Sequence, residues 1–155
     1  MDKSALTQAM KASISEVLEQ MFFMPIEFTA PIDSGGEPLS VAASLIARIG
    51  FCGSPSGTFV LVIPLALAQS VSADFLGLAV QSLSDDQVTG TVLEMVNMLA
   101  GGTLSKYDHQ ALFDLQIPEL ITFSHLRTLT EGGSDPIVIG IHTLDSWMTF
   151  QLIEQ

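Results

Sequence analysis

The sequence predicts an α/β (α+β) fold with pseudo-two-fold symmetry, in which two halves each supply a helix followed by three strands and the long helices pack on an antiparallel sheet. Three observations lead to this prediction. Apolar residues recur at helical spacing in two separate segments, each segment precedes apolar strand-like runs, and the two halves share short sequence matches. We expect a single domain over residues 1–155, with pseudo-repeats at about 4–63 and 84–155 and a linking helix over 64–77.

The first half begins with a predicted helix over residues 4–24, which Pro25 ends. The apolar residues of this helix step by three and four positions, as expected for one buried face. They are Leu6, Met10, Ile14, Val17, Leu18 and Met21. Strands are then predicted over residues 26–32, 40–51 and 57–63, with turns at 35–38 (GGEP) and 52–57 (CGSPSG).

The linking helix and the second half also carry boundary signals. Pro64 suits the first position of the linking helix, and Gly77 suits its C-terminal stop. Ser84 and Gln87 form a capping-box pattern, which predicts a long helix over residues 85–106. After a looser stretch, strands are predicted over residues 119–126, 136–144 and 146–154.

Two short matches relate the halves. Residues 17–22 (VLEQMF) align with 92–97 (VLEMVN) at an offset of 75 positions, with Val, Leu and Glu identical. Residues 58–63 (TFVLVI) align with 149–154 (TFQLIE) at an offset of 91 positions. Both matches fall at the same place in the order of elements, so a duplication is predicted.

The long helix carries a polar pair opposite its apolar face. At about 100° per residue, one side of this helix is apolar and is expected to pack on the sheet. That side consists of Val88, Val92, Met95 and Leu99. Glu94 and Asn97 lie roughly opposite, flanked along the same stripe by Gly90 and Gly101. Because glycine costs about 1 kcal/mol relative to alanine inside a helix, the two glycines suggest that another backbone approaches there.

A structural interpretation of this stripe stands beside the functional one. Glu94 and Asn97 can form an ordinary solvated face, and Gly101 with Gly102 can mark the end of the helix. In the aligned first helix the Glu recurs as Glu19, whereas Phe22 stands in the position of Asn97. If Asn97 carries chemistry, the first helix has no equivalent site, and Phe22 serves packing in the core or in an interface.

The stretch LEMVNMLAGG, with Glu-x-x-Asn followed by small residues on a long helix, resembles the active-site helix of the chemotaxis phosphatase family of CheC, CheX and FliY, and CheX-like members in particular. The resemblance implies a pseudo-two-fold α/β fold, a homodimer, and dephosphorylation of a phosphorylated CheY-type response regulator. It implies that Glu94 pairs with a Lys of the regulator and that Asn97 orients the attacking water.

The resemblance also bears on residues that contact the partner. Gly90 stands where the family has Asp or Ser, and Pro118 is the candidate for a family Pro about twenty residues after the Asn. Gly90, Gly101, Met98 and Pro118 are therefore expected to contact the regulator, although a Met at this position also suits the core. The chain is expected to need no cofactor of its own, because the regulator would carry a divalent metal such as Mg²⁺.

Composition narrows the classes of partner and the compartment. Five Lys and Arg against 17 Asp and Glu give a net charge of -12, so we expect neither nucleic-acid nor membrane binding. One cysteine, Cys52, cannot form an intrachain disulfide, and it supplies no zinc spacing with the scattered histidines. Residues 1–20 lack the apolar core of a signal peptide, and the apolar run 58–68 is too short to span a bilayer. We expect residence in the cytoplasm.

Two other classes of function remain open from the sequence. The chain can be a non-catalytic module that binds a receiver domain or a flagellar component, or an unrelated domain that binds a small molecule or dimerises. A Ser/His nucleophile pair is not predicted, because Ser124 and His125 are adjacent in a strand-like segment and would point to opposite faces.

Overall fold

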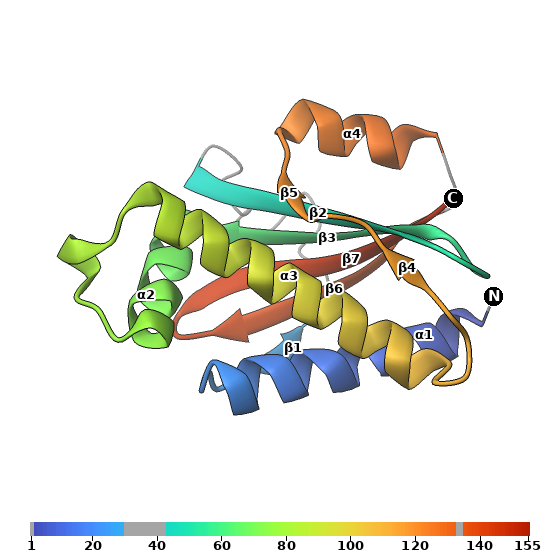
Figure 1. Cartoon of the computed structure of the whole chain (residues 1–155), viewed down its shortest axis with the longest axis horizontal. Helices are drawn as coiled ribbons and strands as arrows, with labels where there is room; N and C mark the ends of the chain where they lie inside the picture. Colours follow the sequence, from blue (N-terminus) through green and yellow to red (C-terminus); the bar gives the residue numbers. More distant parts are fainter. Residues whose placement is uncertain (1, 30–42, 133–134) are drawn as a thin grey trace.

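Four helices pack on one seven-stranded antiparallel sheet in this computed structural model, which describes residues 2–29, 43–132 and 135–155. Figure 1 shows α1 and α3 side by side across one face of the sheet. The elements in chain order are α1 (Lys3–Ile14), the π-helix η1 (Ser15–Met21), β1 (Glu27–Thr29), β2 (Ser44–Cys52), β3 (Gly57–Pro64), α2 (Leu65–Leu76), the 3-10 helix η3 (Val80–Ser82), α3 (Asp85–Tyr107), β4 (Asp114–Leu115), β5 (Glu119–Leu120), α4 (Phe123–Glu131), β6 (Ile137–Thr143) and β7 (Ser146–Glu154).

The sheet is symmetrical in its strand order, β1-β6-β7-β3-β2-β4, with β5 also pairing with β2. The central pair is β3 with β7. The outer strands of each half pair with a strand of the other half: β1 pairs with β6, and β4 and β5 pair with β2. The 91-position offset between the halves takes Val60 to Gln151, and these two residues are Cα partners in the sheet. This arrangement supports the proposed duplication, whose boundaries at 4–63 and 84–155 stay a prediction.

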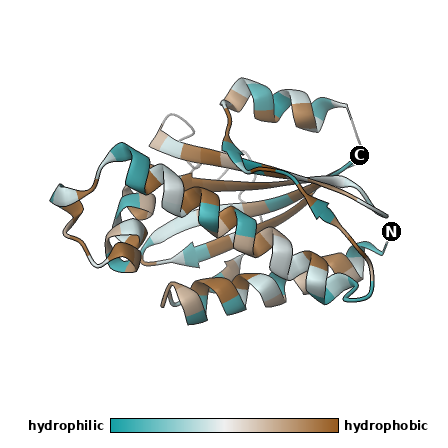
Figure 2. Cartoon of the chain, in the orientation of Figure 1, coloured by the Kyte–Doolittle hydropathy of each residue, from teal (hydrophilic) through white to brown (hydrophobic). Residues whose placement is uncertain are grey.

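The main core lies between the sheet and α1, α2 and α3. Side chains alternate along each strand, so that Phe59 and Leu61 of β3 face these helices while Val60 and Val62 face the other side. The rings of Phe59 and Phe150, from the two central strands, stack with centroids 5.3 Å apart. Figure 2 shows β3 as a mostly hydrophobic strand, in keeping with its burial from Gly57 to Ile63.

The predicted helix boundaries are confirmed in the second half and in the linking helix. Ser84 caps α3 with both bonds of a capping box: its Oγ accepts from Gln87 N at 3.1 Å, and Gln87 Oε1 accepts from Ser84 N at 2.9 Å. Gly77 ends α2 in the left-handed region, at φ 68°. Pro64 is the N-cap of α2 rather than its first helical residue. The strands predicted over 136–144 and 146–154 are β6 and β7.

The first half matches its prediction in part. The helix predicted over 4–24 consists of α1 and η1, and it ends at Met21, with Phe22 as its C-cap and Phe23 at φ 55°. Strands β1, β2 and β3 are found within or across the predicted ranges. The turn predicted at 35–38 lies outside the residues that the structure describes.

The prediction of a strand over residues 119–126 is wrong. Only Glu119 and Leu120 are extended, and α4 begins at Phe123. Thr122 caps this helix, since its Oγ1 accepts from His125 N at 3.1 Å. Leu126 is 8% exposed and packs against the second face of the sheet, in a cluster with Ile46, Val60, Val62 and Ile153.

One further prediction changes with this correction. Ser124 and His125 lie on one turn of α4 rather than on opposite faces of a strand, and both are exposed. Helix α4 extends to Glu131, between the ranges predicted as strands over 119–126 and 136–144. The second half therefore contains an additional helix between its outer and inner strands.

Candidate functional site

Helix α3 holds the candidate site on its outward side. The residues predicted to face the sheet are all buried, namely Val88, Val92, Met95 and Leu99. Glu94 is exposed and Asn97, which is the chain's only asparagine, is half-buried. The helix packs against α1, α2 and β2 along its length, so the backbone beneath the pair is firmly held.

Neither polar side chain of the pair is engaged within the described part of the chain. The side chains of Glu94 and Asn97 form no hydrogen bond or ion pair with any other residue that the structure describes. A carboxylate offers only acceptors, whereas a carboxamide offers both an acceptor and donors. The pair can therefore meet a cation and a water molecule brought by a partner.

The glycines of α3 have three different surroundings. A Cβ added at Gly90 meets nothing within 4 Å, and one added at Gly101 meets only Leu115 Cδ1, at 3.7 Å. A Cβ added at Gly102 clashes with the side chain of Ser13 on α1. Ser13 is buried there, and its Oγ donates to Leu99 O at 2.9 Å. Gly102 thus permits close packing of α1 on α3, and the helix continues past both glycines to Tyr107.

The other predicted contact residues lie close to α3 or to the strands beside it. Met98 is half-buried and packs against the main core, which fits the structural alternative for this residue. Pro118 is half-buried, directly before β5, and it follows Ile117, which is 88% exposed. No atom of the described residues lies within 4 Å of a Cβ added at Gly90. The backbone predicted to approach this glycine would therefore have to belong to a partner.

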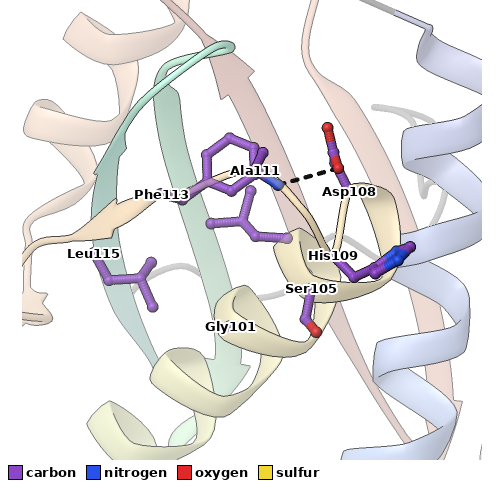
Figure 3. Close-up of a pocket in the computed structure, with 8 residues that line it drawn as sticks. Gly101, Ser105, Asp108, His109, Ala111, Phe113 and Leu115 are labelled. Carbon is purple, nitrogen blue, oxygen red and sulfur yellow. Dashed lines mark hydrogen bonds between the residues drawn. The ribbon is translucent and has the colours of Figure 1, made fainter.

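A pocket of about 200 Å³ lies at the C-terminal end of the same helix (Figure 3). Its lining combines one end of α3 with the segment that leads into β4, and consists of Gly101, Leu104, Ser105, Asp108, His109, Ala111, Phe113 and Leu115. The Asp108 carboxylate accepts hydrogen bonds from the backbone N–H groups of Gln110 and Ala111, each at 3.1 Å, which shapes the turn after the helix. Sequence reasoning did not find this pocket, although Ser105 and Asp108 continue the stripe of Asn97 and Gly101 at helical spacing.

The equivalent position in the first half is closed. Glu19 is exposed, but Phe22 is 5% exposed and stacks on Phe75 of α2 with ring centroids 4.8 Å apart. This confirms the core interpretation of Phe22. The first helix therefore presents only half of the polar pair.

Two other kinds of site are not found in the described ranges. No three His, Cys, Asp or Glu side chains among these residues gather in a way that would hold a metal ion. None of the helices described combines the length and the apolar composition that crossing a membrane requires.

Comparisons with known proteins bear on this arrangement. A family model described as chemotaxis phosphatase CheX matches residues 45–142, a stretch that contains Glu94 and Asn97. No curated protein matches the chain.

Several solved structures share the fold over nearly the whole chain. The CheX-CheY-BeF3-Mg²⁺ complex from Borrelia burgdorferi has a TM-score of 0.77 at 18% identity and covers 97% of each chain. A CheC-like superfamily protein from Shewanella sp. PV-4 has a TM-score of 0.76 at 18% identity, over 100% of this chain and 99% of that chain. FliY from Thermotoga maritima has a TM-score of 0.63 at 14% identity, over 99% of this chain and 91% of that chain.

Proposed function

Because the chain belongs to the chemotaxis phosphatase family CheX, we propose that it hydrolyses the phospho-aspartate of a CheY-type response regulator. Asn97 orients the attacking water, and Glu94 pairs with a Lys of the regulator. The observation that carries the proposal is the unengaged pair of exposed Glu94 and half-buried Asn97 on the outward side of a helix whose opposite side is buried in the core.

The proposed reaction requires little covalent chemistry from the protein. Water attacks the phosphorus, the bond between phosphorus and the aspartyl oxygen breaks, and the products are inorganic phosphate and the free aspartate. Catalysis of phosphoryl transfer depends mainly on positioning the nucleophile and stabilising spread charge. The Asn97 carboxamide can accept a hydrogen bond from the water through its oxygen and donate one through its nitrogen, which suits it to hold the water in line with phosphorus.

The partner supplies the rest of the charge stabilisation in this proposal. The Borrelia burgdorferi complex contains CheX, CheY, BeF3 and Mg²⁺, and we propose by analogy that this chain's regulator carries the divalent metal. Glu94 then orients the regulator through its Lys. Gly90, where the family has Asp or Ser, supplies no side chain, so the proposed chemistry rests on Glu94 and Asn97 alone.

The proposal includes a homodimeric state, which the family resemblance implies, and a cytoplasmic location. Sedimentation velocity of the purified chain tests the first, with a single species at twice the monomer mass as the expected result. Cell fractionation tests the second.

The decisive experiment follows the decay of phosphate from a phosphorylated CheY-type regulator with the wild-type chain, with Asn97→Ala, and without either. We expect Asn97→Ala to lose turnover by about 100-fold or more, since the water is no longer oriented, while binding of the regulator is retained. Comparable decay with wild type and Asn97→Ala would contradict the catalytic role.

A matched pair of variants tests Glu94. Glu94→Ala is expected to weaken regulator binding, whereas Glu19→Ala, at the aligned and exposed position of the first helix, is expected to have no effect. Equal decay with and without wild type, together with retained binding of a beryllofluoride-activated receiver domain, would instead identify a non-catalytic binding module.

A further inference from the structure

The stripe that carries Glu94 and Asn97 leads directly into the pocket at the end of α3. Gly101 and Ser105 follow Asn97 at steps of four residues, so all three lie on one side of the helix, and Asp108 is the C-cap directly after it. Gly101, Ser105 and Asp108 line the pocket. Figure 3 shows Phe113 and Leu115 on one side of it and Asp108 and His109 on the other. The pocket is therefore a continuation of the proposed site.

The segment that forms the far wall exposes large apolar side chains. Leu112 is 93% exposed, Ile117 is 88% exposed and Leu115 is 38% exposed; we call these three residues the apolar rim. Leu115 lies against Gly101, because a Cβ added there would be 3.7 Å from Leu115 Cδ1. Of the apolar rim, Leu115 also lines the pocket together with Phe113, and exposed apolar side chains beside a pocket are typical of a protein interface.

We propose that this pocket and the apolar rim bind an apolar side chain of the receiver domain, so that docking extends along α3 well beyond the polar pair. The inference rests on the proposed function. A standard interface covers about 800 Å² on each partner, equivalent to a disc of about 16 Å radius. At about 1.5 Å per residue, Gly101 lies about 6 Å and Ser105 about 12 Å beyond Asn97 along the helix. A receiver centred on Asn97 therefore covers the pocket.

Charge disfavours an anionic occupant, and Leu104, Phe113 and Leu115 in the lining favour an apolar one. None of the residues that line the pocket is a Lys or Arg, and the Asp108 carboxylate stands at its edge, so an anionic group is disfavoured. The chain's net charge of -12 also gives no long-range attraction to an acidic receiver. Affinity must then come from local contacts, and the apolar rim can supply them.

The test measures KM and kcat for dephosphorylation with Leu115→Ser, Ile117→Ser and Gly101→Leu, the last of which fills the pocket. The control is Phe123→Ser on α4, which is 46% exposed and lies on the other face of the sheet. We expect the three variants to raise KM about tenfold while kcat at saturating receiver stays near that of wild type, and the control to change neither. Asn97→Ala is expected to do the opposite: it should lower kcat while KM stays near that of wild type.

Binding of a beryllofluoride-activated, Mg²⁺-loaded receiver gives a second readout, in which the same three variants should raise Kd by the same factor. Thermal unfolding identifies any variant whose fold is damaged; Ile117 is so exposed that its substitution leaves the fold intact. KM and Kd within twofold of wild type for Ile117→Ser and Gly101→Leu, with wild type active, would overturn the pocket's assignment and leave the proposed function standing. A wild-type chain that neither binds nor dephosphorylates any receiver would overturn both.

Discussion

At the scale of single residues, Gly90 and Gly102 lie on the same helix in opposite surroundings, so alanine should act in opposite directions. Gly90 has open space around it, and Gly90→Ala is expected to stabilise the protein by up to about 1 kcal/mol through helix propensity. Gly102→Ala is expected to destabilise it, because the new methyl displaces buried Ser13 from its bond to Leu99 O. Urea unfolding of both variants measures the two free-energy changes.

The control is a double-mutant cycle with Ser13→Ala. If the clash with Ser13 explains the loss of stability, Gly102→Ala should lower the free energy of unfolding less in the Ser13→Ala background than in wild type. Equal stability of Gly90→Ala and Gly102→Ala would contradict this account of α1–α3 packing. A raised KM in the more stable Gly90→Ala variant would also support a close approach of the receiver at that position.

Because Phe22 is buried, we predict that a second site cannot be built in the first helix by substituting this residue. Phe22→Asn would restore the Glu-x-x-Asn pattern beside Glu19, but the amide would be buried beneath Phe75 in place of a stacked ring. Loss of the ring leaves a cavity, and an unpartnered buried amide adds its own cost, so a loss of about 3 kcal/mol or more is expected. Measured in the Asn97→Ala background, phosphatase activity should not return; recovered turnover would show that the first helix can open.

At the scale of elements, loss of the N-terminal cap of α3 is expected to lower the stability of the protein without changing its activity. Ser84→Ala removes one bond of the capping box and is expected to cost about 1 kcal/mol. Turnover at 25 °C should be unchanged, since the site lies about three turns away along the helix. Ser82→Ala, in the neighbouring η3, is the matched control, and equal unfolding midpoints for the two variants would show that the cap contributes little.

Elements with strong local signals could be predicted from the sequence, and α4 could not. The capping box, the apolar periodicity and Gly77 identified α3 and α2, and they placed Glu94 and Asn97 on the outward side. Residues 119–126 are short and apolar, and such a run fits a strand or a helix equally well. The choice of helix depends on the Thr122 cap and on Leu126 packing against the second face of the sheet, a face that appears only once β2, β3 and β7 have paired.

The pocket beside the site was missed for a similar reason. It forms because the segment before β4 folds back over the end of α3, where Leu115 meets Gly101. That contact depends on the pairing of β4 with β2, which joins residues far apart in the sequence. The spacing in the sequence places Ser105 and Asp108 at helical intervals from the stripe, but it does not indicate which segment forms the opposite wall of the pocket.

At the scale of the whole molecule, acidic groups greatly outnumber basic ones, and each of the five Lys and Arg is already engaged. Arg48, Lys106 and Arg127 pair with Glu119, Glu16 and Glu131. Lys3 donates to Asp135 O, and Lys11 lies over the ring of Phe28. Repulsion among the remaining carboxylates is then the dominant long-range electrostatic effect on the folded state.

This excess of negative charge predicts that salt stabilises the fold. Raising NaCl shortens the range of repulsion between exposed carboxylates, to about 10 Å at 0.1 M and about 3 Å at 1 M. The same screening weakens the three ion pairs, but all are partly or largely exposed, and such pairs typically contribute about 0–1 kcal/mol each. Thermal unfolding should therefore give a Tm that rises with NaCl concentration. Glu19→Gln, which removes one exposed charge, should raise the Tm at low salt and flatten that rise, whereas a Tm that falls with salt would show that the ion pairs outweigh the repulsion.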